Sequence, residues 1–112
     1  MLSNLTTLIG VVNVDNSVQA TLITRSKTVT AEGDIIELVV WRVPVPVPPS
    51  LHDFKYRAAF VVDGKRVVGF DNERGKGDHK HIMGRETVYR FTSVEQMVED
   101  FINEVDAIRR QR

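Results

Sequence analysis

Residues 54–70 read FKYRAAFVVDGKRVVGF and contain the clearest structural signal in the chain. Two mainly apolar segments, 54–62 and 65–70, flank the dipeptide Asp63-Gly64. This dipeptide favours the tight two-residue turn of a β-hairpin, because both positions accept positive φ angles at low cost. The stretch therefore predicts two antiparallel strands joined by this turn.

The register of this hairpin follows from its two-residue loop. Such a loop places Phe60 opposite Val67 and Tyr56 opposite Asp71. Asp71 would then lie at a strand end, beside a phenol and close to Arg57. We therefore expect Asp71 and Arg57 to contribute to one site.

Two further strands are predicted on the N-terminal side of this hairpin. Residues 18–30 are rich in Thr, Val, Leu and Ile, and residues 35–43 carry apolar side chains on both faces. Both compositions favour strands, and residues 31–34 form the turn between them. Residues 1–17 are ambiguous, and form either an edge strand or a tail before a single domain, residues 18–112.

The segments after the hairpin are a loop, a short strand and a helix. Residues 43–49 hold four prolines, which favour an extended surface connector. Residues 71–84 are expected to form a loop, and residues 87–91 a fifth strand. The predicted fold is therefore α+β, with an antiparallel sheet of four or five strands in a hairpin meander and a C-terminal helix on one face.

The C-terminal helix is predicted over residues 94–109. Its apolar side chains recur at three- and four-residue steps, as in an amphipathic helix that packs on a sheet. Thr92 or Ser93 is the expected N-cap, with Glu95 or Gln96 placed for a capping box. The apolar stripe comprises Val94, Met97, Val98, Phe101, Ile102, Val105 and Ile108.

Composition indicates an ordinary globular protein. Apolar residues make up 42% of the 112 residues and charged residues 27%, and there is no cysteine. The absence of cysteine excludes disulfides and thiolate metal sites, and no apolar run approaches the ~20 residues that cross a bilayer. The start of the chain lacks the pattern of a signal peptide, so we expect a cytoplasmic location without membrane contact.

Charge is distributed unevenly although the net charge is zero. Residues 55–90 hold nine basic and five acidic groups, whereas the segments before and after hold three and five each. A positive segment can attract a phosphate ligand. The excess is modest compared with that of a dedicated nucleic-acid-binding domain.

Residues 69–81 are the candidate functional segment, since they combine three glycines with His79 and His81. Two imidazoles two residues apart on an extended segment project to the same side. They can act as general base and general acid in metal-independent RNA cleavage, and Asp71 can orient one of them. The cations available to phosphate or RNA are Arg57, Arg74, Lys76, Lys80 and Arg85.

Other interpretations of these residues stay open. The histidines can be solvated loop residues, or metal ligands if Asp71, Asp78 or Glu86 supplies an oxygen. No zinc signature is matched, so no metal and no cofactor are assigned. His52, after the prolines, is interpreted as a solvated turn residue.

Several spaced motifs between residues 19 and 109 resemble the TumE family of bacterial toxin–antitoxin proteins. They are Trp41-Arg42-Val43-Pro44, Val47-Pro48 with Tyr56-Arg57, Phe70-Asp71-Asn72, His79-Lys80-His81 and Tyr89-Arg90-Phe91-Thr92-Ser93. The resemblance implies the toxin of a type II system and a partner encoded next to it, a small DNA-binding antitoxin. It does not identify catalytic residues.

These observations together favour a toxin that acts on RNA, as an endoribonuclease with His79 and His81 as its acid–base pair. A second copy of the chain is a further candidate partner. Two alternatives remain: a non-enzymatic domain that docks an acidic partner, and a metal-dependent hydrolase or nuclease that uses the same histidines.

Overall fold

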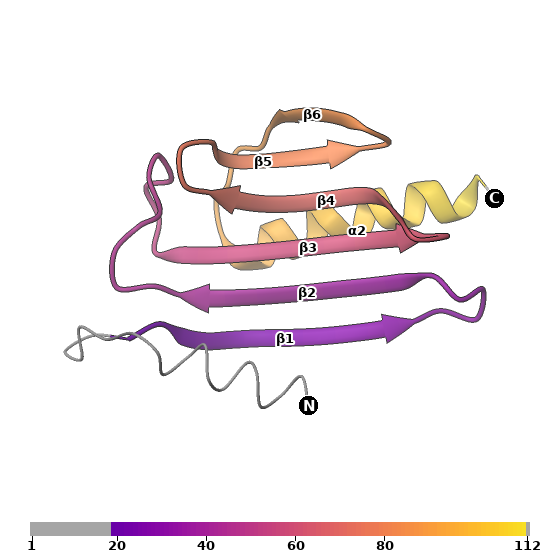
Figure 1. Cartoon of the computed structure of the whole chain (residues 1–112), viewed down its shortest axis with the longest axis horizontal. Coiled ribbons are helices and arrows are strands. Elements are labelled where there is room, and N and C mark those ends of the chain that lie inside the picture. The colour runs from indigo at the N-terminus through magenta and orange to yellow at the C-terminus, as the bar shows by residue number, and fades with distance from the viewer. Residues whose placement is uncertain (1–18, 112) are drawn as a thin grey trace.

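The computed structural model describes residues 19–111, and these residues form six strands followed by one helix (Figure 1). The expected tail or edge strand over residues 1–17 lies outside the described residues. The elements are β1 (Thr21–Val29), β2 (Ile35–Arg42), β3 (Phe54–Val62), β4 (Lys65–Glu73), β5 (Gly77–Ile82), β6 (Arg85–Val88) and α2 (Val94–Arg110).

The strands form one antiparallel sheet, in which each strand pairs with the next one along the chain. Helix α2 lies across one face and contacts β3 and β4 (Figure 1). The predicted α+β meander is confirmed. The predicted number of four or five strands is wrong, because the described residues contain six.

The additional strand comes from residues 71–84, which were expected to form a loop. Strand β4 continues to Glu73, and β5 begins at Gly77 after a tight turn. The turn needs positive φ at Gly75 (88°) and Gly77 (77°), which glycine adopts without steric cost. A second tight turn, with positive φ at Met83 (50°) and Gly84 (86°), leads into β6. Both glycine-containing turns therefore join strands.

The hairpin of β3 and β4 contains a β-bulge close to its turn. Phe60 pairs with Val68, whereas Val61 pairs with Arg66, so that Val67 is the extra residue of β4. A bulge shifts every later pair by one residue. The expected pairing of Phe60 with Val67 is therefore wrong.

This shift changes which side chain faces Asp71. The partner of Asp71 in β3 is Arg57, and not Tyr56 as predicted. Because side chains alternate between the faces of a strand, Asp71 shares a face with Arg57. Tyr56 lies on the other face, in the core.

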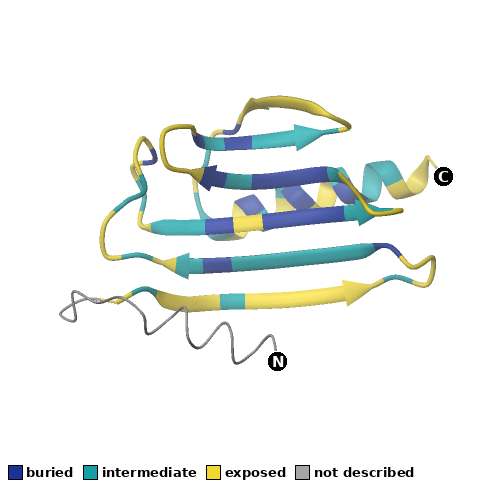
Figure 2. Ribbon diagram, in the orientation of Figure 1, coloured by how far each residue is buried: buried dark blue, intermediate teal, exposed yellow. Residues whose placement is uncertain are grey.

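The hydrophobic core lies between α2 and the central strands. Figure 2 shows the buried positions concentrated on β3, β4 and the sheet-facing side of α2, whereas β1 and β6 are mostly exposed. Phe101 packs edge-on against Phe70, with ring centroids 5.9 Å apart. The buried core residues are Val40, Tyr56, Ala58, Phe60, Val68, Phe70, Tyr89, Met97, Phe101 and Val105.

Helix α2 confirms most of its predicted features. Ser93 is the N-cap, and its hydroxyl accepts a hydrogen bond from the Gln96 amide. The Gln96 side chain donates to Asp100 instead of closing a capping box. Ile102 is 38% exposed and lies outside the core. Within residues 19–111, no helix has both the length and the apolar character needed to span a bilayer.

Candidate functional site

The predicted catalytic residues gather on the sheet face opposite α2. In β4, Val68 and Phe70 point to the helix, so Asp71 points to the opposite face. His79 of β5 is the cross-strand partner of Asp71, and His81 lies two residues further along the same face. The structure thus brings all three residues together, and their catalytic roles stay a prediction.

His79 is buried on this face, and its ring is held in a defined orientation. Only 3% of the residue is exposed, and its Nδ1 lies 2.9 Å from the carbonyl oxygen of Gly77. A carbonyl oxygen only accepts hydrogen bonds, so Nδ1 is the donor. The Nε2 atom lies 2.6 Å from Oδ1 of Asp71. That oxygen is buried and receives no hydrogen bond, so it is not aligned with a ring N–H.

His81 and Glu86 lie beside His79 on the same face. The two imidazole rings meet edge to face with centroids 5.1 Å apart. Burial lowers the pKa of His81, and the charge of Arg66 acts in the same direction. Glu86 of β6 pairs across strands with His81, and its Oε2 lies 3.9 Å from Nε2 of His79.

Two cations border this cluster. Lys76 lies 2.8 Å from Oε2 of Glu86, and this hydrogen bond raises the pKa of Lys76 and lowers the pKa of Glu86. Arg66 lies 3.8 Å from Oδ2 of Asp71. Arg66 was not among the residues predicted from the sequence. Its side chain lies over Gly69, where a Cβ would be only 2.9 Å away.

Two overlapping groups of these residues could hold a metal ion. Within residues 19–111 they are His79 with His81 and Glu86, and His79 with Asp71 and Glu73. In each group the ligand atoms all lie within 4.8 Å of one another. His79 belongs to both groups.

An open hollow of about 520 Å³ adjoins the cluster through Asp71. Arg57 of β3 and Arg74 of the β4–β5 turn both line it, and their phosphate-binding role stays a prediction. The other lining residues are Val47, Lys55 and Glu73.

The remaining predicted cations are not gathered around this hollow. Lys76 is paired with Glu86 at the histidine cluster. Lys80 lies on the face covered by α2, where it forms an ion pair of 3.6 Å with Glu104 of the helix. Arg85 is an exposed residue of β6. Its cross-strand partner Ile82 shares the helix-facing side with Lys80, so the structure separates both Lys80 and Arg85 from the histidine cluster.

Comparison with known proteins identifies the family. A family model described as Toxin TumE matches residues 8–109, which is most of the chain. The chain belongs to the TumE toxin family. A toxin family implies an antitoxin partner. No curated protein and no solved structure matches the chain.

A second polar network of this TumE-family chain lies on the helix-facing side of the sheet, around Asp78. This carboxylate accepts hydrogen bonds from Ser50 (2.5 Å), His52 (2.7 Å) and Tyr56 (2.7 Å). Burial, and then the hydrogen bond to Asp78, raise the pKa of Tyr56. Asp78 thus accepts three hydrogen bonds, and it belongs to neither group of residues that could hold a metal ion.

His52 is an anchored residue, so its interpretation as a solvated turn residue is wrong. Its Nδ1 accepts from the amide of Phe54 and its Nε2 donates to Asp78. The ring stacks on Phe91 with centroids 3.7 Å apart. The segment after the prolines is thereby attached to β5, close to the toxin's histidine cluster.

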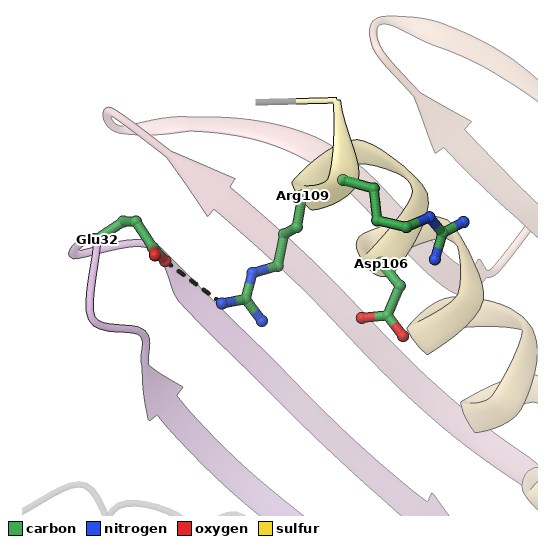
Figure 3. A pocket seen from close by; sticks show the side chains of 4 residues that line it. Glu32, Asp106 and Arg109 are labelled. Carbon is green, nitrogen blue, oxygen red and sulfur yellow. Dashed lines mark hydrogen bonds and ion pairs between the residues drawn. The ribbon is translucent and has the colours of Figure 1, made fainter.

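The toxin has another hollow, of about 430 Å³, between the β1–β2 turn and the C-terminal end of α2. Figure 3 shows Arg109 extending from α2 toward Glu32, and their ion pair measures 3.3 Å. Asp106 and Arg110 complete the lining. Both partners of the ion pair are well exposed, and the lining contains no histidine. This hollow is therefore a weaker candidate for a catalytic site.

Proposed function

We propose that this TumE-family toxin cleaves the phosphodiester backbone of RNA at the sheet face opposite α2. The observation that carries the proposal is the convergence of Asp71, His79 and His81 beside a hollow lined by Arg57 and Arg74. Cleavage of a phosphodiester needs groups that move protons or activate water, next to cations that stabilise the phosphate charge. This face offers both kinds of group.

The two histidines are expected to play different roles in this reaction. His79 is buried, and both ring nitrogens already lie beside oxygen atoms of Gly77 and Asp71. His81 is only partly buried, so its ring is the more accessible to a substrate. We therefore assign the substrate contact to His81 and the shaping of the site to His79 and Asp71.

Arg57 and Arg74 are the proposed phosphate contacts. They come from β3 and from the β4–β5 turn, and so approach the hollow from two elements. Guanidinium groups bind phosphate oxygens through paired N–H donors. The hollow is within the size range of small-ligand sites, so it fits one nucleotide unit of a longer RNA.

The antitoxin is proposed to be a small DNA-binding protein encoded beside the toxin. Covering the face opposite α2 would block His81 and the two arginines together. Expression of the toxin alone should then arrest growth, and co-expression of the neighbouring gene should restore it.

The test uses purified toxin and single-stranded RNA, with Lys80→Ala as the matched control. Arg57→Ala and Lys80→Ala each remove one positive charge, but Lys80 lies on the helix-covered face. Arg57→Ala should weaken RNA binding and reduce the slope of log affinity against log salt by about 0.7 per lost phosphate contact. Lys80→Ala should leave both quantities unchanged.

A catalytic readout completes the test. His81→Ala should abolish both RNA cleavage and growth arrest while the protein stays folded. If His81→Ala still arrests growth and the parent leaves RNA intact, the face is a docking surface for an acidic partner instead.

A further inference from the structure

We infer that His79, His81 and Glu86 bind one divalent transition-metal ion, with Asp71 as the adjacent oxygen donor. This inference differs from the expectation of metal-independent chemistry drawn from the sequence, and it makes His81 a metal ligand in place of the direct substrate contact assigned above. It concerns the same face as the proposed function, but the binding of the ion does not depend on RNA being the substrate.

The first observation is the tautomer of His79. Its Nδ1–H donates to the carbonyl oxygen of Gly77, so Nε2 is the ring nitrogen that faces the cluster and can bind an ion. Metal-bound histidines are held in this way, because a second hydrogen bond fixes the ring and directs the other nitrogen to the ion. The ring is buried, so its orientation is set before any ion arrives.

The second observation is the contact between His79 and Asp71. Nε2 and Oδ1 are 2.6 Å apart, yet Oδ1 is buried and accepts no hydrogen bond. The Asp71 carboxylate thus places a buried oxygen beside the ring nitrogen, with no hydrogen bond occupying that oxygen. A metal ion bound next to both atoms would use this oxygen as a further ligand.

The third observation is the position of His81 and Glu86. They are cross-strand partners on β5 and β6, and their ligand atoms lie within 4.8 Å of each other and of His79. Two imidazoles and a carboxylate form a nitrogen-rich set, which favours Zn²⁺ and related ions over Mg²⁺. Three protein ligands with an open position are typical of catalytic zinc sites, where a bound water becomes the nucleophile.

Lys76 competes with the ion for Glu86. Its Nζ lies 2.8 Å from Oε2, so this contact must break before Glu86 can bind a metal. The Lys76 side chain is 46% exposed and can move into solvent. Removal of Lys76 should therefore strengthen metal binding, although the same change would weaken phosphate binding if Lys76 contacted RNA.

The experiment titrates the metal-free full chain with ZnCl₂ and measures binding by calorimetry without RNA. We expect one equivalent of Zn²⁺. His81→Ala and Glu86→Gln should weaken binding by more than the ~10–100-fold that is typical for loss of an outer-shell partner. Lys76→Ala should bind more tightly than the parent. His52→Gln is the control, because His52 belongs to neither candidate metal group.

His81 and Glu86 lie outside the hydrophobic core, so their replacement should leave the protein folded. A thermal melt of each variant checks this. A parent that takes up no zinc would overturn the inference, and so would unchanged affinity in both His81→Ala and Glu86→Gln. Zinc binding without RNA cleavage would overturn the proposed RNA activity and leave the metal site standing. RNA cleavage by protein that binds no zinc would overturn the metal site and leave the proposed RNA activity standing.

Discussion

Strands β4 and β5 present two different chemistries on their two faces. The face toward α2 carries Phe70 and Asn72, which are fully buried, and packs against the helix. The opposite face carries Asp71, His79 and His81 within a few ångströms of one another. Because adjacent residues alternate between faces, neighbours in the sequence serve separate purposes, one stabilising the sheet and one forming the candidate site.

This comparison predicts that substitutions sort by face and not by position along the chain. Changes to buried side chains on the helix-facing side should lower the free energy of unfolding. Changes on the opposite side should alter binding or activity and leave stability nearly constant.

Phe101→Ala should cause the largest loss of stability. The ring is 1% exposed and packs edge-on against Phe70, so its removal leaves a cavity between helix and sheet. We expect the free energy of unfolding to fall by about 3–5 kcal/mol, as measured by urea denaturation. Ile102→Ala is the control on the same helix, since Ile102 is 38% exposed. Equal effects of the two changes would mean that α2 packs in a different orientation.

Ser50→Ala should have the next largest effect. Its hydroxyl donates to Asp78 at 2.5 Å and accepts from Asn72 at 3.3 Å. Hydrogen bonds to charged groups contribute about 1.5–3 kcal/mol each, and we expect a loss of that size in the same denaturation assay. Asp78 keeps His52 and Tyr56 as donors, which limits the loss.

An unchanged midpoint for Ser50→Ala would contradict the view that the segment after the prolines braces β5. Asp53→Ala provides a matched control in the same segment, because Asp53 is exposed. Its side chain should contribute little to stability.

The parts of the fold that the sequence predicted are those with strong local signals. Asp63-Gly64 has the turn chemistry of a two-residue hairpin, and both residues adopt positive φ as expected. The stripe around Phe101 has helical spacing, and Ser93 caps the helix. These signals depend only on neighbours in the chain.

Strand β5 was missed because it has no apolar face. Asp78 and Lys80 point to the helix side, where they bond to other side chains, and His79 and His81 point to the other side. Period-two alternation of apolar and polar residues is the usual strand signal, and it is absent here. Tertiary partners stabilise this strand, and they cannot be read from its own sequence.

The candidate site was predicted in its members but not in its geometry. Asp71 and the two histidines, which the sequence singled out, lie close together in the structure, and their roles stay a prediction. The bulge at Phe60 and Val61 placed Arg57 beside Asp71 through a different register from the predicted one. A bulge depends on how two strands pack, so the turn residues alone could not reveal it.

Ser93→Ala should lower the free energy of unfolding by less than Phe101→Ala or Ser50→Ala. The Ser93 hydroxyl accepts one hydrogen bond from the Gln96 amide at the exposed start of α2. Loss of such an N-cap typically costs about 1 kcal/mol. The change should lower the urea midpoint slightly, and Ser93→Asp should restore it because Asp is an equally good cap. Failure of Asp to restore stability would show that the cap does not limit the helix.

His81→Ala should have the smallest effect on stability and the clearest effect on function. His81 is partly exposed and lies on the face opposite α2, where its ring contacts His79 but fills no part of the core. Such a change should alter the free energy of unfolding by no more than about 0.5 kcal/mol. Growth arrest should nevertheless be lost.

Lys80→Ala, on the other face of β5, is the control. It should also leave stability nearly unchanged, because the ion pair of Lys80 with Glu104 is partly exposed, but it should retain growth arrest. If His81→Ala instead unfolded the protein, or if both variants lost toxicity equally, the two faces of β5 would not divide stability from chemistry, and the histidine cluster would be part of the scaffold.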